Sequence, residues 1–141
     1  MKKIGIIIIC LLIVVIFITK YNENKEMLEK YKENILTYHY NESANSVVIL
    51  NAHYKHFDKN EKLHFIYKLE NQFNSLTYDY ETLKMDTDLP QTEIENIITK
   101  SKELSLYCKT SKKLSNEKKE EIYVFLSEIK DFNEQLIKKV K

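Results

Sequence analysis

The chain of 141 residues contains one glycine and one proline and carries a formal net charge of +1. So few turn-forming residues disfavour all-β and α/β folds and favour long helices. All the basic residues are lysines, so the bidentate arginine contacts that dominate base and phosphate recognition are missing, and we predict no nucleic-acid partner.

The first predicted element is a run of apolar residues from Ile4 to Ile18, with two lysines before it and Lys20 after it. This layout is typical of a secretory signal or signal anchor, and the lack of small residues at the exit argues against cleavage. At ~1.5 Å per residue the run covers about 23 Å of a hydrocarbon layer roughly 30 Å thick, and flanking lysines that reach the headgroups extend it. We predict that residues 1–20 form a single-pass transmembrane anchor in the cell membrane through residues 4–18, with the bulk of the chain extracytoplasmic.

Apolar spacing next predicts one helix over about residues 22–40 and a second over about residues 43–57. The first is also consistent with an outward continuation of the membrane helix. Ser43 stands where an N-cap would begin the second helix. The predicted buried stripes are Leu28, Tyr31, Ile35 and Tyr38 in the first helix, and Val47, Leu50, Tyr54 and Phe57 in the second.

The strongest periodic signal lies over about residues 60–85. Asp86, Asp88 and Pro90 then break the helix, and a proline suits the first turn of the helix that follows. After a connector over residues 109–115, a last helix is predicted over residues 116–140. The predicted core stripes are Ile66, Leu69, Phe73, Leu76, Tyr80 and Leu83, then Ile94, Ile97, Leu104 and Cys108, and finally Ile122, Phe125, Ile129, Phe132 and Leu136.

These short connectors between helices of similar length predict an all-α fold, in which residues 21–141 form an up-and-down bundle of four or five helices. An elongated coiled coil is the alternative. The apolar stripe shifts phase at each break, which favours the bundle.

Charge and cysteine are unevenly distributed along the chain. Acidic residues outnumber lysines over residues 20–99, and lysines prevail over residues 100–141. The basic segment either packs against acidic neighbours in the same fold or presents a lysine stripe to anionic lipid. Because Cys10 lies in the apolar run, a disulfide at Cys108 would have to join two copies of the chain.

The candidate metal ligands are three histidines. His53 and His56 are three residues apart on a predicted helix, and His64 follows nearby. A zinc site needs further ligands at defined spacing, and none of the known zinc motifs is present. We therefore interpret the three histidines as solvated side chains, with metal binding as the less favoured alternative.

Ten tyrosines are available for contacts with a partner. Those on the apolar stripes, namely Tyr31, Tyr38, Tyr54 and Tyr80, are predicted to be core residues. Those off the stripes are the candidate partner-binding residues, because exposed tyrosines are common in interfaces. These candidates are Tyr40, Tyr67, Tyr78 and Tyr123.

No pattern in the chain predicts catalysis. The acidic pairs Glu93 with Glu95 and Glu120 with Glu121 are interpreted as solvated helix faces, and neither a phosphate-binding glycine loop nor a nucleophile elbow is present. We predict a membrane-anchored helical module that binds another protein or itself, without a cofactor. The alternatives are a metal-binding or sensing domain outside the cytoplasm and a helical module that binds the membrane surface.

Overall fold

The computed structural model describes residues 11–139 with their side chains, and its secondary structure extends from residue 2 to residue 140. Over that range the chain forms no strand and four α-helices: α1 (Lys2–Val48), α2 (Lys59–Leu83), α3 (Gln91–Thr110) and α4 (Asn116–Val140). The all-α prediction is confirmed. The chain divides into two units, Met1–Asn34 and Ile35–Lys141.

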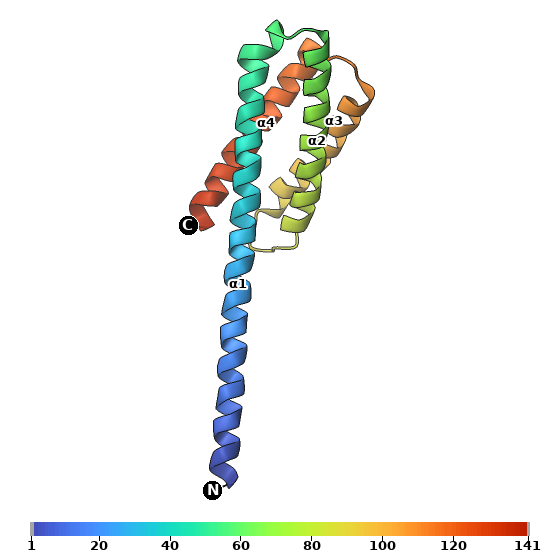
Figure 1. Ribbon diagram of the computed structural model, residues 1–141. Coiled ribbons are helices and arrows are strands. Elements are labelled where there is room, and N and C mark those ends of the chain that lie inside the picture. The colour runs from blue at the N-terminus through green and yellow to red at the C-terminus, as the bar shows by residue number, and fades with distance from the viewer. Residues whose placement is uncertain (1, 141) are drawn as a thin grey trace. The chain divides into compact units, whose positions relative to one another are not determined.

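The second unit is a bundle of four helices. Its members, the C-terminal part of α1 followed by α2, α3 and α4, run in alternating directions (Figure 1). The connectors over residues 49–58 and 111–115 lie at one end of the bundle, and the connector over residues 84–90 lies at the other. The predicted helical bundle is confirmed for this unit, and the alternative of an elongated coiled coil is wrong for it.

The core is built from the apolar stripes predicted for α2, α3 and α4. All the stripe residues of α2 and α3 are buried, and in α4 only Phe132 stays half-buried. Full burial of such a side chain contributes about 1.5–3 kcal/mol, so these stripes supply the main driving force for packing. Aromatic rings join the helices where Phe73 faces Phe125 at 6.1 Å between ring centroids and Tyr80 faces Phe132 at 6.4 Å.

The passage from α1 to α2 differs from the prediction. The helices expected over residues 22–40 and 43–57 are not separate, because α1 continues without a break to Val48. Ser43 is therefore no N-cap but a fully buried residue inside α1. A π-helical turn at Ile49–His53 and a 3₁₀ turn at Tyr54–His56 then lead to the start of α2.

A capping box begins α2. The side chain of Asp58 accepts hydrogen bonds from the backbone N–H groups of Asn60 and Glu61, at 2.7 and 2.9 Å. The Glu61 carboxylate in turn accepts one from the backbone N–H of Asp58 at 2.7 Å. Together these bonds satisfy donors that a helix start otherwise leaves unpaired, which fixes the start of α2 at Lys59. At the start of α3, Pro90 lies one residue outside the helix rather than in its first turn.

Several side chains buried in the bundle are polar. Ser46 of α1 donates a hydrogen bond to Gln72 of α2 at 2.8 Å, and Tyr80 donates one to Asn133 of α4. Other buried polar atoms have no partner within the described residues, and an unpaired buried polar group is unfavourable. These atoms are His39 Nδ1, Ser43 Oγ, Gln72 Nε2, Ser101 Oγ and Asn133 Nδ2.

Polar residues also occupy the buried face of α1, where the sequence predicted tyrosines. His39, Ser43 and Ser46 are fully buried, whereas Tyr31 is 47% and Tyr38 is 50% exposed. The prediction that these two tyrosines belong to the core is wrong. The predictions that place Tyr54 and Tyr80 in the core are confirmed.

The predicted membrane anchor lies only partly within the described residues. Residues 4–10 of the apolar run fall outside the part of the chain whose side chains are described. Among the residues that are described, no helix has an apolar stretch long enough to cross a bilayer.

Candidate functional site

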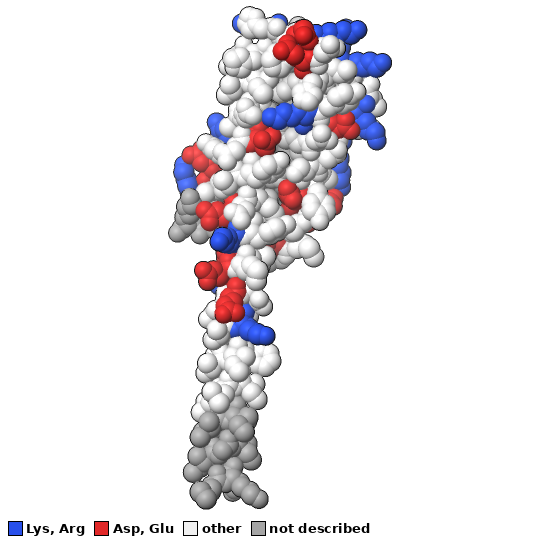
Figure 2. Space-filling model, in the orientation of Figure 1, with Lys and Arg blue, Asp and Glu red and all other residues white. Residues whose placement is uncertain are grey.

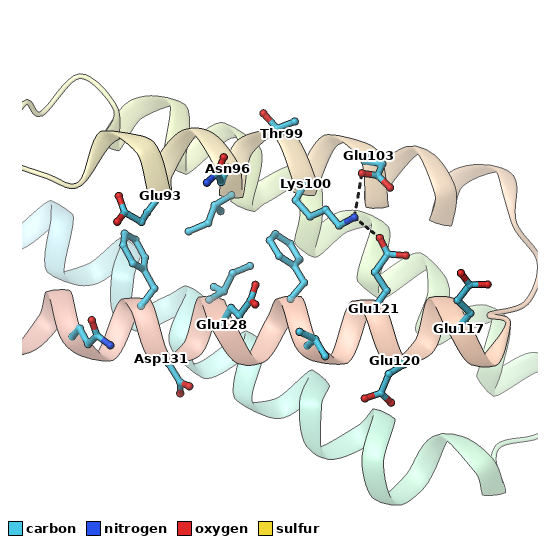
Figure 3. A pocket seen from close by; sticks show the side chains of 16 residues that line it. Glu93, Asn96, Thr99, Lys100, Glu103, Glu117, Glu120, Glu121, Glu128 and Asp131 are labelled. Atoms are coloured by element: carbon cyan, nitrogen blue, oxygen red, sulfur yellow. Dashed lines mark hydrogen bonds and ion pairs between the residues drawn. The ribbon is translucent and has the colours of Figure 1, made fainter.

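A groove with a volume of about 1080 Å³ lies between α3 and α4 (Figure 3). Its floor is apolar and comes from both helices. Val124 is 45% exposed, Phe132 is half-buried, and the remaining floor residues lie deeper in the core. The floor consists of Ile97 from α3 and Val124, Phe125, Ile129 and Phe132 from α4.

Carboxylates border this floor on both edges. On α4 they recur at the three- and four-residue spacings that place side chains along one face of a helix. On α3 the edge is more mixed, because Asn96, Thr99 and Lys100 separate two glutamates. The acidic residues of the two edges are Glu93 and Glu103 of α3, and Glu117, Glu120, Glu121, Glu128 and Asp131 of α4.

Four charged residues form a clasp across the end of the groove nearest the α3–α4 connector: Lys100 and Glu103 of α3, and Lys118 and Glu121 of α4. Lys100 bonds to Glu121 and also lies 3.2 Å from Glu103 (Figure 3). Lys118 lies 2.6 Å from Glu121 and 3.5 Å from Glu103. The hydrogen bonds from Lys100 and Lys118 lower the pKa of the Glu121 carboxyl, and the bond to Glu121 raises the pKa of each lysine.

Outside the clasp, most of the acidic edge has no basic partner. Glu93, Glu117, Glu120 and Glu128 form no ion pair within the described residues, and Asp131 is paired only with its neighbour Lys130, at 3.3 Å. An ion pair between two adjacent surface residues contributes little to stability. The groove therefore combines an apolar floor with an excess of negative charge.

This combination suits the binding of a helix. An amphipathic helix in a groove places its apolar side chains on an apolar floor and its charged flanks along the edges. The lining contains no histidine, cysteine, serine or tyrosine. The residues of the lining provide an apolar surface flanked by charge.

The predicted tyrosine contacts do not lie in this groove. Tyr67 and Tyr78 are 52% and 72% exposed, while Tyr40 and Tyr123 are half-buried, and Tyr123 packs against the core. Tyr67 lines a hollow between α1 and α2, and Tyr78 lines another between α2 and α3. The structure therefore does not bring the four tyrosines together into one surface.

The histidine candidates are all exposed. His53 ends the π-helical turn and His56 ends the 3₁₀ turn, so they do not share the regular helix face on which their spacing was interpreted. Within residues 11–139, no group of three or more His, Cys, Asp or Glu side chains is arranged to hold a metal ion. His64 instead lines the hollow that contains Tyr67.

Lysines of the basic segment pair with acidic residues of neighbouring helices. Lys102 lies 2.6 Å from Glu81 of α2, and Lys100 and Lys118 belong to the clasp. For these three lysines, packing against acidic neighbours in the same fold is confirmed. On the face shown in Figure 2, charges of both signs are interspersed over the bundle.

Sequence reasoning missed the groove because it interpreted Glu93, Glu120 and Glu121 as solvated side chains. A usable signal was present in the spacing. Acidic residues follow the apolar stripe of α4 along one flank from Glu117 to Asp131, and only Val124 interrupts them with an exposed apolar side chain.

The chain was compared with protein-family models, with curated proteins and with solved structures, and none of them matches it.

Proposed function

We propose that the chain is a membrane-anchored helical module that binds another protein by receiving an amphipathic helix in the α3–α4 groove. The observation that carries this proposal is the apolar floor around Val124 and Phe132, which is open between acidic edges. Binding of a partner over the exposed part of the floor is favourable, because it removes apolar surface from water.

The size of the groove supports a helical occupant. Its α4 edge extends from Glu117 to Gln135, which corresponds to about 27 Å at ~1.5 Å rise per residue. A partner helix of roughly five turns spans that length. Helices of this length are common, and helix-in-groove binding needs only a few apolar anchors spaced along one face.

Charge favours another protein over a second copy of the chain as the occupant. If two copies met symmetrically through this groove, the unpaired carboxylates of Glu117, Glu120 and Glu128 would face the same carboxylates of the other copy. Like charges held close together in an interface are unfavourable. A partner of different composition avoids this repulsion.

Membrane anchoring rests on the apolar run at the N-terminus. Every side chain from Leu11 to Ile18 is 48–72% exposed, so the protein does not cover this stretch. A continuous apolar surface of this kind is unfavourable in water and is typical of contact with lipid or a partner. The preceding residues of the run, from Ile4 onward, are apolar as well.

Alkaline carbonate extraction of cells that express the full chain tests the anchor. We expect the protein to stay in the membrane pellet. A variant in which Ile8, Val14 and Ile16 are all replaced by aspartate is the control and should move to the supernatant. Recovery of the unaltered chain in the supernatant would contradict anchoring.

Photocrosslinking tests the groove. The full chain in phosphatidylcholine nanodiscs carries benzoylphenylalanine at position 124, or at position 106 as a matched control, because Leu106 is an exposed apolar residue of α3 outside the groove. The probes are synthetic helices of about 18 residues that share one leucine stripe and have lysine, glutamine or glutamate flanks. We expect saturable crosslinking of at least one probe at position 124 and not at position 106. Equal labelling at both positions, or none at 124 with any probe, overturns the proposal.

A further inference from the structure

We infer that the partner helix carries two pairs of basic residues on one flank, three helical turns apart, with an apolar anchor between them. This inference rests on the proposed function and specifies the partner of the same groove. It follows from the arrangement of charge along α4, which differs from that along α3.

Outside the clasp, the acidic charge of the α4 edge lies in two places, and among these residues only Asp131 has an ion pair within the described part of the chain, with its neighbour Lys130. Glu117 and Glu120 form one pair, one helical turn apart, and Glu128 and Asp131 form a second pair with the same spacing. The midpoints of the two pairs are separated by about 16 Å along the helix. Between the pairs lies Val124, whose exposed side chain belongs to the apolar floor.

The α3 edge carries much less unpaired charge. The clasp occupies Glu103, and Asn96 and Thr99 are uncharged, so Glu93 is the only α3 carboxylate of the groove without an ion pair in the described residues. A partner helix therefore meets a strongly acidic edge on one side and a nearly neutral edge on the other. Complementarity requires basic residues on one flank and uncharged polar residues on the opposite flank.

The spacing of the carboxylates sets the spacing of the cations. A helix that lies along α4 has the same rise per residue, so basic residues at positions i, i+3, i+11 and i+14 match the two pairs. An apolar residue near i+7 then faces Val124. A helix with equally many basic residues in one block reaches only one of the two pairs.

Three synthetic probes of about 18 residues test this inference by fluorescence anisotropy, with the full chain in phosphatidylcholine nanodiscs and empty nanodiscs as the blank. The matched probe has lysines at i, i+3, i+11 and i+14. The block probe has them at i, i+3, i+4 and i+7, and the neutral probe has glutamine at the four matched positions. We expect the matched probe to bind about tenfold more tightly than the neutral one and several-fold more tightly than the block one, with a smaller preference at high salt.

Charge-removal variants locate the effect. Glu117→Gln/Glu120→Gln and Glu128→Gln/Asp131→Asn should each reduce the affinity for the matched probe several-fold and leave that for the neutral probe unchanged. The control Glu23→Gln/Glu26→Gln removes the same charge from exposed positions of the first unit and should change neither affinity. All four groove side chains are exposed, so folding should persist, and circular dichroism checks the helicity of each variant.

The outcomes separate the two proposals. Equal binding of the matched and neutral probes, with crosslinking at position 124 retained, overturns the inference about charge and leaves helix binding in place. Equal binding of the matched and block probes overturns the inferred spacing. Failure of every probe to bind overturns the proposed function together with this inference.

Discussion

The Nε2 atom of His39 in α1 lies 2.7 Å from Oδ2 of Asp79 in α2, and the imidazole is fully buried. An ionised carboxylate only accepts hydrogen bonds, so the imidazole nitrogen donates and the unpaired Nδ1 carries a lone pair. Ser75 donates a second bond to the same carboxylate oxygen at 3.2 Å. The ring centroids of Tyr38 and Tyr80 lie 5.0 and 5.8 Å from that of the imidazole, both in edge-on arrangements.

We predict that acidification destabilises the bundle through His39. Burial lowers the pKa of His39 below the usual 6.5, although the hydrogen bond to Asp79 and the charges of Asp79 and Glu42 oppose this shift. The unfolded chain therefore takes up a proton as the pH falls through about 6.5 while the folded chain does not, so stability present above that pH is lost below it. The Tm of the full chain, followed by circular dichroism, should fall between about pH 7.5 and about pH 5.5. The Tm of the His39→Gln variant should depend less on pH than the Tm of the exposed control His53→Gln. A Tm of the unaltered chain that rises on acidification would refute the prediction.

The buried bond between Tyr80 and Asn133 should show strong coupling. Tyr80→Phe leaves the Asn133 carbonyl oxygen buried without a donor and should cost about 1–3 kcal/mol in urea unfolding. Adding Asn133→Leu removes the orphaned amide, so the double variant should recover most of that loss. Burial also raises the pKa of Tyr80, so the phenol stays protonated as the donor. Strictly additive effects of the two substitutions would argue against the bond.

Removal of an unpaired hydroxyl should stabilise the protein. Ser101 is fully buried and its Oγ has no partner within the described residues, so Ser101→Ala should raise the free energy of unfolding by about 1 kcal/mol. Ser105 is the matched control in the same helix, because its Oγ donates to Asn74 at 2.6 Å. Ser105→Ala should bring no such gain. A loss of stability in the Ser101→Ala variant would show that its hydroxyl has a partner.

Loss of the capping box should weaken α2. Asp58→Ala removes the acceptor for two backbone N–H groups and should lower the free energy of unfolding by about 1 kcal/mol. Asp58→Asn keeps an acceptor oxygen and should retain most of the stability. Equal losses in the two variants would mean that the charge of Asp58, rather than its hydrogen bonds, stabilises the helix start.

The Cys108 thiol should be unreactive in the folded protein. It is fully buried, and burial raises its pKa to about 12, so the folded chain presents almost no thiolate at neutral pH. The idea that Cys108 joins two copies by a disulfide therefore conflicts with its position. In a Cys10→Ser variant, a thiol reagent such as DTNB should label Cys108 slowly under native conditions and rapidly in denaturant. Rapid native labelling would contradict this burial.

The helices α2, α3 and α4 were predictable because their core positions are almost continuously apolar, as the stripe from Ile66 to Leu83 illustrates. The buried face of α1 was not predictable in the same way. It contains His39, Ser43 and Ser46, so a search for apolar periodicity selects the tyrosines beside that face. A single sequence does not distinguish polar residues that pair inside a bundle from polar residues on its surface.

The spacing of the acidic residues indicates a charged flank on α4, but the groove itself could not be predicted from it, because a groove also depends on the separation of two helices. The spacing of Glu117 and Glu128 in the sequence would be the same whether the surface beside them were flat or concave. The prediction that exposed tyrosines contact a partner stays a prediction. Tyr67 and Tyr78 are exposed as expected, but the packing of α2 turns them toward different neighbours.

The buried hydrogen bond from Ser46 to Gln72 has a consequence for the alignment of α1 against α2. If α1 slid by one helical turn, the Ser46 hydroxyl would lose its acceptor. Gln72 would then be left without any hydrogen bond, unless the slip brought the buried hydroxyl of Ser43 to the same place. An interface made only of apolar side chains would tolerate such a shift, because successive turns of an apolar helix face are similar. The hydrogen bond between Ser46 and Gln72 therefore favours the observed axial alignment of α1 and α2.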